Sequence, residues 1–222
     1  MYRRTGRYLS YKEAQALSPV EYKTKYPGAY LIMWDTTDRP LDGEPSDRWL
    51  RYVTYSDYYG GCVMKGGVGL QQGVWLVPGE LWTGGVSDTD FLVVAGILDE
   101  QAVVAARQSD APPMTNICDK GMRCEHEAWA RGRQLLVTPT FRRRDSPSFA
   151  PGEVAHSTSL AHDRGPNERA VRLACLDGIN RQPIPSSMAL DDANMFWMNG
   201  CSDANWTRAP LWRSLLAMWA QL

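Results

Sequence analysis

The stretch PPMTNICDKGMRCEHEAWARGRQLLVTP, residues 112–139, contains the alternation that decides the fold. A short apolar run over 115–119 has the length and composition of a strand, and it ends in Asp119. Residues 125–132 then predict a helix that a glycine closes, and residues 133–139 predict a second strand. A strand, a helix and a strand in this order indicate an α/β fold.

Asp119 has two interpretations in this stretch. An aspartate at the carboxyl end of a strand is where an α/β fold displays catalytic or ligand-binding groups. The commoner use of Asp in such a turn is to cap the next helix. The stretch by itself fits both interpretations.

The segments before this stretch extend the sheet. Residues 29–38 form a continuous apolar run that ends in acids, which is typical of a strand buried on both faces. Residues 39–48 predict a loop from their Pro, Gly and Asp content. Residues 61–85 predict a hairpin of two strands, and Pro78 places the second strand at an edge or a bulge.

Helices are expected on both sides of the strand–helix–strand unit. Residues 86–98 predict a helix that Ser87 and Asp88 cap. Residues 153–179 have helical spacing but are expected to break at Gly165 and Pro166, because a proline removes a backbone hydrogen bond. An amphipathic helix rich in Trp and Leu is predicted at the carboxyl-terminal end, over 210–222.

The composition is that of an ordinary soluble globular chain with one sizeable core. The 222 residues are 44% hydrophobic and 22% charged, and no segment reaches the roughly 20 apolar residues of a membrane span. The formal net charge of −1 creates no global field toward nucleic acid. Nine tryptophans favour an aromatic-rich core or a surface that meets a partner. The five cysteines are odd in number and lack a CxxC spacing, so they indicate reduced thiols in an intracellular protein.

These elements predict a mixed sheet of about five strands flanked by helices. Two carboxylates, Asp35 and Asp119, are expected at the carboxyl ends of two strands, and a third, Glu168, lies on the following helix. Oxygen ligands of this kind suit Mg²⁺, which is usually held by one or two carboxylates and several waters. In-line phosphodiester chemistry uses two such ions about 3.5–4 Å apart.

Six strings in this order resemble the catalytic domain of the DDE-superfamily endonucleases, the Harbinger-type and related transposases. The likeness covers about residues 17–175. The strings are ALSPVEYKTKYPGAYLIMWDTTD, TYSDYYGGCVMKGGVGL, GELWTGGVSDTDFLVVAGIL, NICDKGM, LLVTPTF and SLAHDRGPNERAV. Each string is weak alone, and their common order is what makes the likeness specific.

The resemblance implies a ribonuclease-H-like fold over residues 29–180, with Asp35, Asp119 and Glu168 as a metal-binding triad for Mg²⁺ or Mn²⁺. It implies DNA as the substrate and the nucleus as the compartment. Residues 1–28 would then be an amino-terminal extension and residues 181–222 a carboxyl-terminal helical extension.

The residues keep other interpretations open. Asp35 could end its strand and bond the turn at Thr36, Asp119 could cap a helix, and Glu168 could pair with Arg172 on the helix surface.

Three departures from the family favour a second function class, a domesticated and catalytically inactive descendant. The sequence GPN at 165–167 interrupts the helix before Glu168, only about 28 residues precede the first expected strand, and the net charge does not favour DNA. Such a descendant would be a structural subunit of a larger assembly, for example in an organelle. It would bind protein partners through Trp-rich surfaces and the carboxyl-terminal helix.

Overall fold

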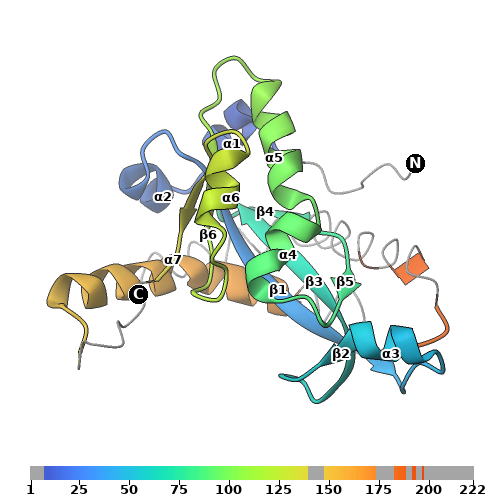
Figure 1. Cartoon of the computed structure of the whole chain (residues 1–222). Coiled ribbons are helices and arrows are strands. Elements are labelled where there is room, and N and C mark those ends of the chain that lie inside the picture. Colours follow the sequence, from blue (N-terminus) through green and yellow to red (C-terminus); the bar gives the residue numbers. More distant parts are fainter. Residues whose placement is uncertain (1–7, 140–147, 174–182, 189–191, 194–196, 198–222) are drawn as a thin grey trace.

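The computed structural model describes residues 8–139, 148–173, 183–188, 192, 193 and 197, which form a mixed sheet with flanking helices (Figure 1). The helices are α1 (Tyr11–Leu17), α2 (Val20–Lys25), α3 (Arg48–Thr54), α4 (Asp88–Val94), α5 (Ile97–Ala106), α6 (Glu125–Ala130) and α7 (Pro151–Leu173). The strands are β1 (Tyr30–Asp42), β2 (Tyr55–Ser56), β3 (Gly61–Gln71), β4 (Trp75–Pro78), β5 (Trp82–Thr83), β6 (Met114–Ile117), β7 (Leu135–Val137) and β8 (Ile184–Pro185). The predicted mixed α/β class is confirmed.

The long strand β1 is the centre of the sheet. It pairs antiparallel with β3 on one side and parallel with β6 on the other, and β6 pairs parallel with β7. The main row is β2-β3-β1-β6-β7, while β4 and β5 also pair with β3 and β8 pairs with β1. The parallel pair β6 and β7 encloses α6, as the strand–helix–strand pattern predicts.

Each face of β1 packs into its own apolar cluster. Tyr30, Ile32 and Trp34 lie in one cluster, and Leu31 and Met33, which alternate with them, lie in the other. The first cluster includes residues of α4, α5 and α6, and the second includes Leu160 of α7. The continuous apolar run therefore forms a strand buried on both faces, as predicted.

The predicted hairpin is formed by β3 and β4, and β4 pairs only with β3 among the described strands. The helix predicted over 86–98 is capped by Ser87, whose side chain accepts from the Asp90 N–H, and it divides into α4 and α5 at Gly96. Gly96 has a φ of +66°, a left-handed conformation that suits glycine.

Three short helices were not predicted. α1 and α2 fall within the expected extension 1–28, and their Ala14 and Tyr22 are buried in the core. α3 begins after Asp47, whose carboxylate accepts from the Leu50 N–H at 2.7 Å.

Two predictions fall outside the described residues, namely the helix over 210–222 and the state of Cys175 and Cys201. The three cysteines within the described ranges are free thiols. No helix in the described part of the chain combines the length and apolar character needed to cross a membrane.

Candidate functional site

Asp35 lies in the middle of β1, not at its end as predicted. The strand continues to Asp42 because β3 is long enough to pair with it as far as Pro40, opposite Val63. Long-range pairing therefore overrides the local signals that predicted a loop from residue 39. The Asp35 side chain is 26% exposed, and its Oδ1 accepts a hydrogen bond from the Thr36 N–H at 3.1 Å.

Asp119 follows β6, the parallel neighbour of β1. Because Met33 pairs with Ile117, Asp35 and Asp119 each stand two residues beyond the same registered pair. α6 begins only at Glu125 and has no side-chain cap. The interpretation of Asp119 as a helix cap is therefore wrong.

Backbone contacts hold the turn after Asp119. The Met122 N–H donates to the Asp119 carbonyl at 3.0 Å, and the Thr89 hydroxyl donates to the Gly121 carbonyl at 2.7 Å. The second contact ties the turn to the start of α4. Neither contact uses the Asp119 carboxylate.

A single guanidinium joins the two acids. Arg164 Nη1 lies 3.0 Å from Asp119 Oδ1, and Nη2 lies 3.7 Å from Asp35 Oδ1. The Arg164 side chain is only 9% exposed. A planar guanidinium is suited to contacts with two carboxylates. No role was predicted for Arg164, which stands only within the string SLAHDRGPNERAV.

The helix that carries Arg164 is continuous, so the predicted break at Gly165 and Pro166 is wrong. A proline inside a helix costs about 3 kcal/mol by intrinsic propensity. Arg164, Pro166 and Asn167 are buried. Tertiary packing of this face therefore outweighs the local preference.

Glu168 lies one turn after Arg164, well inside α7, and not beyond a break in the helix as predicted. Its side chain is exposed. It is nevertheless near enough to Asp35 for its negative charge to raise the pKa of that carboxyl. The structure thus brings Asp35 and Asp119 together at Arg164 and leaves Glu168 at the margin.

Asp163 anchors α7 to α2 and so positions Arg164. Its carboxylate lies 2.6 Å from Lys25 Nζ and accepts a hydrogen bond from the Tyr26 hydroxyl, while its carbonyl accepts from Tyr22 at 2.9 Å. The Asp163 side chain is 5% exposed. These contacts explain why α7 stays helical against the sheet through Pro166.

Asp163→Ala is expected to lower the free energy of unfolding by about 2 kcal/mol, because Lys25 and Tyr26 lose a buried acceptor. Chemical denaturation measures the change. Asp110→Ala is the matched control, since its pair with Lys12 is exposed and spans 3.7 Å, and it should change stability by less than about 0.5 kcal/mol. Equal effects of the two variants would contradict the anchoring role.

A second cation, Lys65, lies in the pocket that Asp35 and Asp119 also line. Lys65 of β3 is buried, with Nζ 2.6 Å from Asp88 Oδ1 and 3.9 Å from Asp38 Oδ1. The Thr36 hydroxyl also donates to Asp88 Oδ1, at 3.0 Å. Asp88 was expected to cap its helix, but Ser87 is the cap and Asp88 faces this network. The alternation of faces along β3 could have predicted which face of the sheet Lys65 occupies. It could not have predicted that Asp38 and Asp88 are its partners.

Lys65 and the carboxylates described above line one pocket of about 580 Å³, the carboxylate pocket, whereas Arg164 is not among its lining residues. It includes Asp35, Asp38, Lys65, Asp88 and Asp119. Burial raises the pKa of Asp35 from 3.8 to about 6, Arg164 opposes the rise, and Glu168 and Asp119 add to it. Burial also raises the pKa of Asp38, against the effect of Lys65. Five carboxylates and one lysine line the pocket, and Arg164 contacts two of those carboxylates.

Asp35 and Asp119 are the two acids of the predicted triad that contact one cationic group. Within the described ranges, no group of three or more His, Cys, Asp and Glu side chains could hold a metal ion together. Two carboxylates that converge on one positive group still match the one or two acids by which Mg²⁺ is commonly held. Comparison of the chain with protein-family models, curated proteins and solved structures found no significant match.

Proposed function

We propose that residues 29–180 form a ribonuclease-H-like DDE domain that cleaves or transfers phosphodiesters of DNA with Mg²⁺ or Mn²⁺. The observation that carries the proposal is that Asp35 and Asp119, from neighbouring parallel strands, line one pocket and contact the same cationic group. The resemblance of the sequence motifs to DDE endonucleases supports the same assignment.

Asp35 and Asp119 would hold the divalent cation, with Glu168 as the third acid. The ion, when bound, would supply charge stabilisation and a more acidic water for attack on phosphorus. Arg164 holds the two carboxylates in place before an ion enters. Once released from them, its guanidinium could bind a phosphate through two hydrogen bonds. Lys65 places a second positive charge in the pocket, where a phosphate would be attracted.

The second candidate is an inactive descendant that serves as a structural subunit, and one observation favours it. Arg164 contacts both carboxylates, so its buried guanidinium would compete with a metal ion for the same oxygens. A buried arginine of this kind resists displacement, because its removal leaves uncompensated charge.

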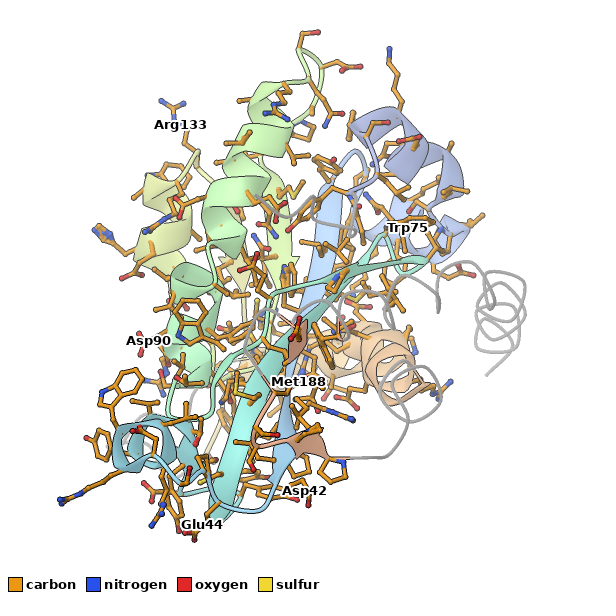
Figure 2. All side chains as sticks on the ribbon, turned by 90° about the vertical axis from the view of Figure 1, so that its right-hand side faces the viewer. Asp42, Glu44, Trp75, Asp90, Arg133 and Met188 are labelled. Carbon is orange, nitrogen blue, oxygen red and sulfur yellow. The ribbon has the colours of Figure 1, made fainter. Side chains whose placement is uncertain are left out.

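A cleavage assay on supercoiled plasmid tests the proposed activity. The wild-type chain should nick the plasmid with Mg²⁺ or Mn²⁺ and not with EDTA, and Asp119→Asn should remove the activity because the pair of metal ligands is lost. Asp42→Asn is the control, since this exposed acid lies at the end of β1, beyond Asp35 (Figure 2). Equal nicking by wild type and Asp119→Asn would overturn the proposed role.

If the wild type does not nick the plasmid, calorimetric titration with Mn²⁺ distinguishes a blocked nuclease site from a structural subunit. Binding that is absent in the wild type and appears in Arg164→Gln would indicate an intact site that the arginine blocks. Absence of binding in both proteins would favour the structural subunit. An active wild type should bind Mn²⁺ directly and lose binding in Asp119→Asn.

A further inference from the structure

Five large aromatic side chains are exposed within one short segment next to the carboxylate pocket. We call this segment, residues 48–59, the aromatic arm; it consists of α3, β2 and the turn that follows. The exposed fractions show that these rings are not core residues, and they belong to Trp49 (69%), Tyr52 (80%), Tyr55 (46%), Tyr58 (97%) and Tyr59 (52%). Exposed aromatics gathered in one place mark an interaction site.

The aromatic arm is held firmly by its backbone. Tyr55 pairs with Cys62 of β3, and the Gly85 N–H donates to the Val53 carbonyl at 3.0 Å. Gly84 packs so closely that a Cβ there would lie 2.6 Å from the Thr54 carbonyl oxygen. The rings are therefore presented from a fixed platform rather than from a loose loop, which lowers the entropic cost of binding.

A second pocket of about 730 Å³ lies along this arm and adjoins the carboxylate pocket. Arg48, Arg51, Tyr52, Tyr55 and Asp57 line it, and Tyr55 and Asp57 line the carboxylate pocket too. Tyr55 thus lies where the two pockets adjoin, and we call the two pockets together the groove; Asp35 and Asp119 line its second part.

The lining of the second pocket combines flat rings with positive charge. Its two arginines outnumber its single acid, Asp57. Arg51 also contacts Glu44 at 3.4 Å, whereas Arg48 makes no ion pair among the described residues. Aromatic faces and arginines along a groove are the features by which proteins bind unpaired nucleotides.

We infer that this groove binds a single-stranded segment of DNA, with bases stacked on Tyr52 and Tyr55 and phosphates at Arg48 and Arg51. The inference rests on the proposed function, because it names the strand that would reach the carboxylate pocket. An unpaired strand fits better than a duplex, since stacking on a protein ring needs a base face that a duplex hides. The aromatic arm would select DNA that is unpaired next to the cleavage point.

Fluorescence anisotropy of a labelled oligothymidylate, measured in EDTA so that no cleavage occurs, tests the inference on the full chain. Tyr55→Ala and Tyr52→Ala should each weaken binding about tenfold, because loss of one stacked ring costs about 1–3 kcal/mol. Tyr55→Phe should bind like the wild type, since it keeps the ring. Trp129→Ala is the control, because this exposed ring lies on α6, away from α3 in Figure 1.

Salt titration checks the phosphate contacts. Arg48→Gln should make the dependence of log affinity on log salt less steep by about 0.7, the value for one phosphate contact on a single strand. Failure of the wild type to bind the oligonucleotide at low salt, or equal losses in Tyr55→Ala and Trp129→Ala, would overturn the inference. Either result would indicate a protein partner for the aromatic arm instead.

The same assay keeps this inference separate from the proposed activity. Asp119→Asn should bind the oligonucleotide at least as tightly as the wild type while failing to cut plasmid. Binding that depends on Tyr55 in a chain that never cuts would refute the nuclease and retain the strand site. Metal-dependent cutting by a chain whose affinity for the oligonucleotide is unchanged in Tyr52→Ala and Tyr55→Ala would support the nuclease and refute the strand site.

Discussion

Gly67→Val should lower the free energy of unfolding by about 3 kcal/mol or more, because it forces a side chain into a filled core. A Cβ at Gly67 would lie 2.2 Å from a ring carbon of Phe91, which is fully buried. The ring belongs to α4, so relief of the clash would have to shift the helix that carries Asp88 into the carboxylate pocket. At about 2–4 °C per kcal/mol for a chain of this size, thermal unfolding should begin about 10 °C earlier.

Gly61→Val is the matched control within the same strand. A Cβ at Gly61 would meet only the Tyr59 ring, at 3.7 Å, which is ordinary contact. The variant should therefore unfold close to the wild-type temperature. The double variant Gly67→Ala/Phe91→Leu should be more stable than Gly67→Ala alone if the clash with the ring is the cause. Similar unfolding temperatures for Gly67→Val and Gly61→Val would contradict the packing argument.

The elements that could be predicted from the sequence are those that local composition determines. The apolar run at 29–34 became the buried start of β1, and the strand–helix–strand stretch became β6, α6 and β7. The hairpin of β3 and β4 and the cap at Ser87 also agree with the prediction. Each of these features depends on neighbours within a few residues of the chain.

The errors arose where distant parts of the chain decide the structure. Residues 39–42 were predicted as loop, but Arg39 and Pro40 pair with β3, and Leu41 and Asp42 pair with β8. Pro166 was predicted to break a helix that packing and the Asp163 contacts keep whole. Propensity gives the local cost of such a conformation and not the tertiary contacts that offset it.

The candidate site also contains residues that could be predicted from the sequence and residues that could not. Asp35 and Asp119 could be nominated from their positions after apolar runs, and the parallel register of β1 and β6 brings them to one pocket. Arg164 and Lys65 could not be predicted as site residues, because their roles depend on contacts with residues far away in the sequence. The cations that balance a carboxylate site are visible only once the elements have been assembled.

Asp35→Asn should stabilise the metal-free protein at pH 8, because the buried carboxyl is costly to ionise. Its pKa is raised from 3.8 to about 6, so the folded protein binds this proton more tightly than the unfolded chain does. The stability that Asp35 contributes is fully present below pH 3.8 and is lost as the pH rises to about 6. The rise in pKa corresponds to about 3 kcal/mol.

Urea unfolding in EDTA at several pH values measures this effect. The wild type should lose stability relative to Asp35→Asn between about pH 4 and pH 6, with a constant difference above that range. Asp42→Asn, which removes an exposed acid from the same strand, should follow the wild type within about 0.5 kcal/mol. A pH-independent difference between Asp35→Asn and the wild type would mean that Arg164 neutralises Asp35 fully. Loss of stability with rising pH would instead mean that the pocket holds an excess of negative charge, which a divalent cation would relieve.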